Sequence, residues 1–364
     1  MNRRISSNQL ISLCFVAMLC PFFRLIPGSV AQLAGKAAWL SAALSGIPAL
    51  ALSCILRCYL SSFAQGTGLG EAVLRTLGPI TGRILLLLWC LWLLLHCSFV
   101  ACSGADRFIA TIYPNTGPQL FIVLMLLICA MASTGTVTPL ARAAQIFRPL
   151  LLGVIILVLG FSLPDIHLSF VFPIFRQDSW NALQAVPLAA ESVSVVLISA
   201  AFLSGNLRPE AGAGKKWPFL VGVTLLAVAV CLITIGNLGQ KQTAREAYPF
   251  FILLRDLRLF TGVERVDSLV VALWLLPDFL LISLELVILR DSLLLVAPED
   301  RGPDLQKLLP WLCLGLTLII SLSIAPRKDI LHRWGNGLIP YTQLLWAYGV
   351  YPAVWLVSLF RKKF

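Results

Sequence analysis

Charged side chains are scarce in this sequence: aspartate, glutamate, lysine and arginine together make up 12% of its 364 residues. A soluble domain carries about twice that share. Hydrophobic residues make up 59%, and the mean hydropathy is +0.88. So few polar groups could not cover so much apolar surface in water, which argues against a soluble enzyme. The high hydrophobicity also excludes a disordered chain. The composition is typical of a helical protein that crosses a membrane several times.

Catalytic and cofactor motifs are missing. The three histidines lie far apart, and there is no nucleophile elbow, phosphate-binding glycine loop or zinc-protease motif. The ten cysteines fall mostly within apolar runs without the spacing of a metal site, so they are interpreted as small hydrophobic residues. We therefore expect no enzyme activity, catalytic residue, metal or cofactor. The net charge of +11 comes from scattered basic residues, which favours contact with anionic lipid rather than nucleic acid.

Long apolar runs are what the sequence has in abundance. They divide the chain into ten segments, each close to the about 20 residues that a helix needs to cross a bilayer. Their continuity excludes the alternating pattern of a β-barrel. The segments are 9–33, 37–60, 82–111, 118–138, 145–164, 181–205, 217–238, 265–290, 308–325 and 337–360. We predict an all-α polytopic protein with one transmembrane domain over residues 1–364, made of two halves at about 9–164 and 181–360.

Lysine and arginine are more frequent in the predicted loops on the side of the chain termini than in the loops on the other side. Because cytoplasmic loops carry the excess of basic residues, both termini are predicted to be cytoplasmic. The first apolar stretch lacks a small-residue cleavage site and is interpreted as a span rather than a signal peptide. The expected location is the cell membrane, with the lipid bilayer as a partner.

One outer loop has helical periodicity of its own. In the segment 248–261 the residues Phe250, Leu253, Leu254, Leu257 and Phe260 share one helical face, and the charged residues lie away from it. This segment is too charged and too short to cross the membrane. We predict an amphipathic helix that lies on, or dips into, the outer face of the bundle.

Prolines interrupt two of the predicted spans. The first span has Pro21 and Pro27 on either side of Arg24, and the sixth has Pro187 four residues before Glu191. Spans 1 and 6 occupy corresponding positions if the chain consists of two five-helix halves. Paired interruptions of this kind indicate an inverted-repeat transporter fold with its ligand site at the breaks. The alternative is that these prolines only kink their helices.

Ionisable residues within the spans mark a candidate site, because a charge at the centre of a membrane helix costs roughly 2.5–3.5 kcal/mol on the insertion scale. Glu191 could bind a ligand ammonium or a coupling cation, or it could be a structural partner for Arg24. Both interpretations stay open. The candidate substrate-binding residues are Arg24, Pro27, Ala190, Glu191, Ser192 and Asp278.

Two further ionisable residues accompany these candidates. Asp278 and Glu285 are seven residues apart and therefore share one face of the eighth span. Whether Asp278 faces a polar cavity stays open, whereas Glu285 is expected near the inner end, paired with Arg290 or solvent. His96, within an apolar run, is expected to be a hydrogen-bonded packing residue rather than a proton relay.

Several of these motifs resemble a known family. The segments Tyr248-Pro249-Phe250, Leu254-Arg255, Gly262 to Asp267 and Trp274 resemble the signature of the spore germination permeases, within the amino acid–polyamine–organocation superfamily. The signature residues in this chain are Pro249, Arg255, Glu264, Arg265 and Trp274. The N-terminal pattern, Ile5-Ser6 with Gln9-Leu10 and then Ala34-Gly35 with Ala38-Trp39-Leu40, is similar too. One departure is the run from Cys20 to Arg24, where family members commonly carry small, glycine-rich residues.

The resemblance implies a leucine-transporter-type fold with broken helices 1 and 6. It also implies a role as the B-subunit of a nutrient germinant receptor in the inner membrane of the spore. Such a subunit senses a small nutrient, an amino acid among the implied ligands, and works with a larger membrane subunit and a lipoprotein. Two alternatives stay open: an ion-coupled secondary amino-acid transporter, and a structural subunit that binds no ligand.

Overall fold

The structure, a computed structural model, describes residues 4–112, 116–208, 217–246, 248–256, 270, 272–297 and 303–361. These residues are almost entirely helical, and they contain one isolated β-bridge, between Ile5 and Leu207, and no strand. The predicted fold class, an all-α polytopic membrane protein, is confirmed.

The helices of the first half follow the predicted apolar segments. They are α1 (Ser7–Arg24), η1 (Leu25–Ser29), α2 (Val30–Ala34), η2 (Gly35–Ala37), α3 (Ala38–Leu44), α4 (Gly46–Ser61), α5 (Leu69–Leu77), α6 (Pro79–Ile112), α7 (Pro118–Ser133) and α8 (Val137–Ser162). The short helix α5 lies outside the ten predicted segments.

The helices of the second half are η3 (Leu168–Phe170), α9 (Arg176–Phe202), η4 (Leu203–Asn206), α10 (Trp217–Leu238), α11 (Gln240–Arg245), α12 (Pro249–Asp256), α14 (Leu275–Val296), α15 (Pro303–Ile324), α16 (Lys328–Arg333), η6 (Trp334–Leu338), α17 (Ile339–Leu344), η7 (Leu345–Val350) and α18 (Tyr351–Phe360). The segments η6 and η7 are π-helical turns.

In the part of the chain that the structure describes, six helical runs are long and apolar enough to cross a membrane, and two shorter apolar helices, Pro118–Ser133 and Leu308–Ile324, accompany them. Helix α14 is equally long, but it carries Asp278, Glu285, Arg290 and Asp291. Its charge therefore distinguishes it from the other long helices.

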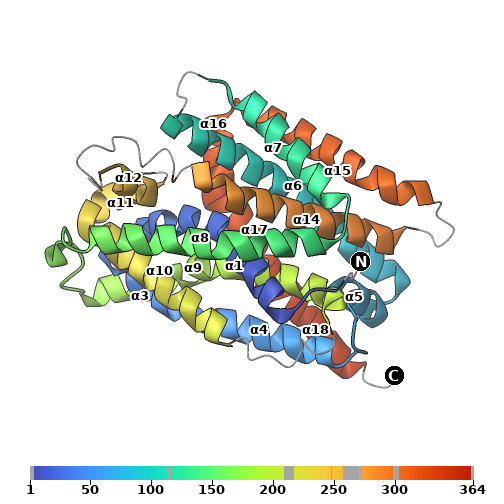
Figure 1. Cartoon of the computed structure of the whole chain (residues 1–364). Helices are drawn as coiled ribbons and strands as arrows, with labels where there is room; N and C mark the ends of the chain where they lie inside the picture. Colours follow the sequence, from blue (N-terminus) through green and yellow to red (C-terminus); the bar gives the residue numbers. More distant parts are fainter. Residues whose placement is uncertain are drawn as a thin grey trace.

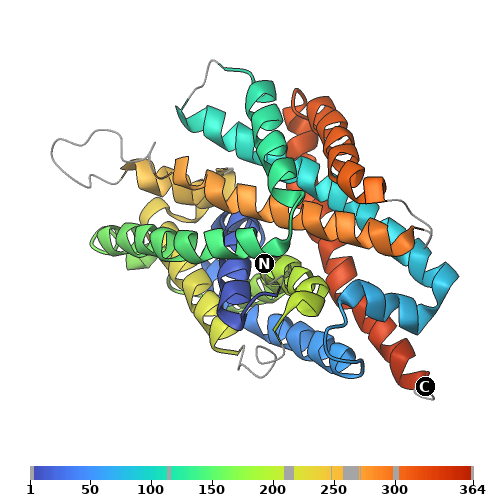
Figure 2. The same cartoon turned by 45° about the vertical axis from the view of Figure 1, so that its right-hand side comes forward.

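The helices form one bundle in which α1 is the most enclosed. Figure 1 shows α6, α7, α14 and α15 on one side, α3, α4 and α10 on the other, and α1 and α9 between them. Helix α14 lies between α8 and the α6–α7 pair in both views (Figures 1 and 2). Helices α7 and α15 expose large apolar side chains, such as Ile128 and Ile319, as lipid-facing helices do.

Some contacts between helices recur at corresponding positions of the two predicted halves. The first span packs against the fifth, α1 on α8, and the sixth packs against the tenth, α9 on α17. Likewise the second span contacts the sixth, α3 on α9, and the seventh contacts the first, α10 on η1. These pairs are the ones that an inverted repeat relates to each other. The repeat itself remains a prediction.

Both described chain ends lie at the same end of the bundle, as an even number of crossings requires. The Ile5 amide donates to the Asn206 carbonyl at 2.8 Å, and Ser204 Oγ donates to the Thr67 carbonyl at 2.8 Å. On the neighbouring α5, the Thr76 carbonyl accepts a hydrogen bond of 2.6 Å from Arg361. In Figure 1 both termini accordingly lie toward the right-hand side.

The two predicted interruptions have different outcomes. The first is present: Ile26 has non-helical angles (φ −109°, ψ 119°) within η1, directly before Pro27. The second is wrong as a break, because α9 runs without interruption through Pro187. One turn before that proline, Ser41 Oγ donates to the Ala182 carbonyl at 2.8 Å. The carbonyl that Pro187 leaves without its backbone donor is the next one, that of Leu183, and membrane helices accommodate such a proline without breaking.

The amphipathic outer helix is present as α12. Its side chains Phe250, Phe251, Leu253 and Leu254 are buried, so the helix enters the outer face of the bundle rather than lying on its surface. The remainder of the predicted segment, residues 257–261, lies outside the described residues.

Single cysteines in a version without the ten natural cysteines test the topology. Exposed positions at the end of the bundle away from the termini, Gln242→Cys and Arg327→Cys, should react with an impermeant maleimide from outside intact cells. Positions at the other end, Gln65→Cys and Thr134→Cys, should react only after permeabilisation, because the positive-inside bias places that end in the cytoplasm. Labelling in the reverse pattern would contradict the predicted orientation.

Candidate functional site

Arg24 ends α1 at the break and is nearly buried, with 10% of its side chain exposed. Its Nη1 atom donates to the Gly335 carbonyl at 2.7 Å. Gly335 lies in the π-helical turn η6, and such turns replace the regular α-helical hydrogen-bond pattern and recur at functional sites. The guanidinium also lies 4.9 Å from the ring centroid of Phe99 on α6. The break in α1 thus presents one cation to the middle of the bundle.

Glu191 on α9 is the charged partner of Arg24. The two side chains form an ion pair with 3.9 Å between Arg24 Nη2 and Glu191 Oε1, and Glu191 is fully buried. This distance is too long for a hydrogen bond. Arg24 Nη2 and both oxygens of Glu191 have no hydrogen-bond partner. The pair joins the two spans that the sequence singled out, but it leaves its strongest donors and acceptors unused.

Two polar residues near this pair were missed by the sequence analysis. Gln343 on α17 donates through Nε2 to Ser194 Oγ at 3.3 Å, and Ser194 in turn donates to the Glu191 carbonyl at 2.7 Å. The Gln343 Oε1 atom and the Tyr348 hydroxyl are buried without a partner, and Tyr348 lies within electrostatic range of Glu191. Glutamine and tyrosine are common in interfacial positions, so neither carries a signal in the sequence.

A cavity leads to Arg24; we call it the outer vestibule, and its end of the bundle the outer end, after the orientation predicted from the basic residues. It is a cavity of about 270 Å³ at the end of the bundle away from the termini, and its walls include Ser29, Tyr248, Lys328 and Asn336. Ser29 Oγ donates to Asn336 Oδ1 at 3.2 Å across the cavity wall. Arg24 both lines this cavity and contacts Glu191, so it links the cavity to the buried carboxylate.

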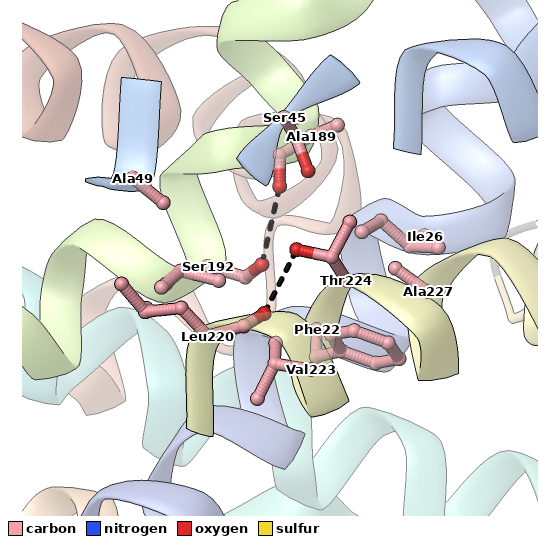
Figure 3. Close-up of a pocket in the computed structure, with 11 residues that line it drawn as sticks. Phe22, Ile26, Ser45, Ala49, Ala189, Ser192, Leu220, Val223, Thr224 and Ala227 are labelled. Atoms are coloured by element: carbon pink, nitrogen blue, oxygen red, sulfur yellow. Dashed lines mark hydrogen bonds between the residues drawn. The ribbon is translucent and has the colours of Figure 1, made fainter. Parts of the chain in front are cut away.

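Ser192 lies on a different face of α9 from the vestibule. With Ala189, Ile26, Ser45 and Thr224 it lines a small space among α1, α4, α9 and α10 (Figure 3) that leaves no room for a water molecule. The hydroxyls there donate to their own helices, Ser192 to the Ala189 carbonyl at 3.4 Å and Thr224 to the Leu220 carbonyl at 2.9 Å (Figure 3). This space is therefore too small to hold a ligand.

The six candidate residues are therefore not one cluster. Arg24 and Glu191 are together, and Pro27 lies buried at the break beside them. Ala190 is buried within α9 next to Glu191. Ser192 and Asp278 face other surroundings.

Asp278 pairs with a basic residue that the sequence analysis did not single out. Arg107 on α6 donates through Nη2 to Asp278 Oδ2, and both side chains are almost fully buried. Gly104 makes room for the carboxylate, because a Cβ there would lie 2.8 Å from Asp278 Oδ2. Arg107 stands at the outer end of its span, where a basic residue is usually solvated, so its burial was not predictable from position.

The expectation for Glu285 is wrong, whereas His96 makes a hydrogen bond as predicted. Glu285 is fully buried and accepts from, or donates to, His96 Nδ1 at 2.7 Å, while Cys97 Sγ donates to its other oxygen at 3.2 Å. Arg290 instead contacts Asp291 and donates to the Ser133 and Gly135 carbonyls. As the seven-residue spacing predicts, Asp278 and Glu285 both face α6.

The described signature residues pack at the outer end of α1. A Cβ at Gly28 would lie 3.3 Å from Pro249 Cδ, so Gly28 allows Pro249 to approach the break. Trp274 is fully buried with its ring 4.8 Å from that of Phe23. Of Arg255 only the backbone, in α12, is described, and Glu264 and Arg265 lie outside the described residues.

Exchanging the charges of the Arg24–Glu191 pair tests its contribution to folding. Removing one partner leaves the other charge buried and unpaired, which typically costs about 3–5 kcal/mol. Arg24→Ala and Glu191→Ala should each lower the yield of folded protein in detergent, measured by fluorescence-detected gel filtration. The double exchange Arg24→Glu with Glu191→Arg should restore part of that yield. If both single variants match the wild type, the pair contributes nothing to stability.

Comparison with known proteins places this arrangement in a family. Residues 4–325 match the family model described as spore germination protein. Spore germination protein XB of Bacillus anthracis is 25% identical over 216 residues, which cover 58% of this chain and 59% of that protein. The putative spore germination protein YfkT of Bacillus subtilis (strain 168) is 27% identical over 200 residues, 54% of each chain. The matched part thus spans little more than half of each relative, whereas the family model covers most of this sequence. The chain belongs to the spore germination protein family, the spore permeases.

Proposed function

We propose that this protein is the membrane subunit of a germinant receptor that senses a small nutrient, an amino acid, and signals to partner subunits. Family membership and the names of its relatives support a role in spore germination. The observation that carries the proposal is the Arg24–Glu191 pair, whose unused donor and two unused acceptors are buried behind the outer vestibule that Arg24 lines.

The chemistry of the pair is complementary to the head group of an amino acid. A guanidinium binds a carboxylate through charge-assisted hydrogen bonds, and a carboxylate binds an ammonium in the same way. Each unsatisfied buried polar group costs roughly 1–3 kcal/mol. An amino acid inserted between Arg24 and Glu191 would satisfy Arg24 Nη2 and the Glu191 oxygens together, and Gln343 Oε1 could accept a further bond from the ammonium.

Sensing requires that the ligand bind one conformation better than another, because equal affinity shifts no equilibrium. The non-helical residue Ile26 lies two residues from Arg24 and provides a hinge between α1 and α2. A ligand that draws Arg24 away from Glu191 or from the Gly335 carbonyl would change how α1 packs on α9 and η6. We propose that this rearrangement reaches a larger membrane subunit and a lipoprotein in the inner membrane of the spore, with both termini of this chain in the cytoplasm.

A second candidate function is ion-coupled amino-acid transport. The observation that favours it is the fully buried His96–Glu285 pair, whose His96 Nε2 atom has no partner and whose groups can exchange a proton. Buried ionisable groups of this kind form proton relays in pumps and transporters.

The dose response of spore germination tests the sensing function. Glu191→Gln keeps the shape of the side chain but removes the charge that would bind an ammonium. We expect it to raise the nutrient concentration for half-maximal germination about tenfold or more, the effect of losing one charge-assisted bond of roughly 1.5–3 kcal/mol. Because Glu191→Gln also leaves the Arg24 charge unpaired, receptor level is measured by immunoblot and dose responses are compared at equal receptor level.

The matched control is Glu71→Gln, at an exposed pair with Arg75 on α5. It should leave the dose response unchanged. An unchanged dose response in Glu191→Gln, at normal protein level, would favour a structural subunit without ligand binding.

Uptake into proteoliposomes separates the sensor from the transporter. The purified subunit alone, given a proton or sodium gradient, should not accumulate radiolabelled amino acid if it only signals through partners. Gradient-driven accumulation that disappears in His96→Asn would overturn the sensor proposal and support the transporter.

A further inference from the structure

Helix α12 fills the outer end of the core beside the break in α1. The Phe250 ring lies 4.3 Å from that of Phe23 and 5.9 Å from that of Trp274, measured between centroids. Pro249 meets Gly28 on the other side of the break. A short outer helix therefore touches α1 both before and after its hinge.

Arg107 contacts aromatic side chains of α12 and of the residue before it. Its guanidinium carbon lies 5.5 Å from the ring centroid of Phe251 and 5.7 Å from that of Tyr248, and the same guanidinium is paired with Asp278. Tyr248 also shares a hydrogen bond of 3.3 Å with Ser103, one turn before Arg107 on α6. One cation on α6 thus joins α14 through an ion pair and α12 through two aromatic rings.

The two kinds of contact differ greatly in strength. A buried, hydrogen-bonded ion pair is costly to separate, because each charge would be left alone in an apolar surrounding. A cation–π contact is much weaker, and aromatic rings can leave a cation without stranding a charge. If α12 moves, the cation–π contacts with Tyr248 and Phe251 break together with the Tyr248–Ser103 hydrogen bond and the packing of Phe250 and Pro249 on the first span, while Arg107 stays in place on Asp278.

Tyr248 connects this movement to the vestibule. It is both a wall residue of the outer cavity and a partner of Arg107. Displacing α12 would therefore widen the vestibule and uncover the outer part of α1, where Cys20 lies beside Asp278.

We propose that α12 is the lid of the ligand site and that Arg107 is the positioning residue that latches it shut. Asp278 holds the guanidinium in place, and the rings of Tyr248 and Phe251 close onto it. This assignment rests on the proposed function, since it describes how access to the Arg24–Glu191 pair is controlled. The Arg107–Asp278 pair thus controls access, whereas the Arg24–Glu191 pair binds the ligand.

The rate at which Cys20 reacts with N-ethylmaleimide reports how often α12 moves away and uncovers this residue. Cys20 is 7% exposed, and mass spectrometry can follow each natural cysteine of the purified protein separately. In Arg107→Gln we expect Cys20 to react about tenfold faster than in the wild type, the effect of losing roughly 1.4 kcal/mol of latch contacts. Cys90 on α6 and Cys313 on α15 should keep their slow rates.

Two variants make the effect specific. Arg83→Gln removes an exposed arginine from the same helix and should change no rate. Arg107→Lys keeps a cation beneath the rings and should restore a slow rate in part, which a purely steric role of the arginine would not explain.

Removing Arg107 also takes a cation away from the nearby Cys20 thiolate, which by itself slows the reaction, so an unchanged Cys20 rate in Arg107→Gln is judged by Phe251→Leu. If all buried cysteines of that variant react faster together, its fold is lost, and Phe251→Leu then decides because it leaves the Arg107–Asp278 pair intact. A Cys20 rate in Phe251→Leu that rises relative to Cys90 supports the lid, and an unchanged one overturns it. No nutrient is present in this experiment, so its failure leaves the proposed function standing.

Discussion

The cost of a charge inside a bilayer governs the core of this protein. Glu191, Asp278 and Glu285 are fully buried, and each meets a basic side chain from another helix. The partners are Arg24, Arg107 and His96. Because a lone charge in hydrocarbon is expensive, these contacts specify which helices become neighbours: α1 with α9, and α6 with α14 twice. Apolar packing among α-helices in lipid offers no comparable selectivity, since lipid tails are as apolar as leucine.

The two arginine–carboxylate pairs have the same chemistry but differ in completeness. Arg107 donates directly to Asp278 and is further surrounded by aromatic rings, so that pair is closed. Arg24 and Glu191 stay 3.9 Å apart, with a donor and two acceptors unmatched. A closed pair fixes two helices relative to each other. A pair whose polar atoms lack partners can still bind a ligand. The Arg24–Glu191 pair lies where the outer vestibule meets the hinge of α1.

The sequence predicts properties that depend on neighbouring residues along the chain. Hydropathy located the ten apolar segments, the period of 3.6 located the buried face of α12, and the seven-residue spacing placed Asp278 and Glu285 on one face. Which side chains pair with each other was harder to predict, because it depends on how the helices pack in three dimensions. Nothing local indicated that Arg107 is buried, that Glu285 lies deep enough to meet His96, or that Gln343 and Tyr348 approach Glu191. Pro187 was misjudged for a similar reason: a membrane helix can continue through a proline, and the local sequence does not indicate whether it does.

The polarity of α14 bears on how the chain enters the membrane during synthesis. Four charged residues make this helix a poor substrate for insertion on its own, unlike α6, whose apolar run is among the strongest in the chain. Helix α6 precedes α14 by about half the sequence, so the ribosome delivers His96 and Arg107 long before Asp278 and Glu285 appear. When α14 is synthesised, the basic side chains that pair with its carboxylates are therefore already in the bilayer. Because of the order of the helices along the chain, stable insertion of the eighth span depends on the third span being in the membrane first.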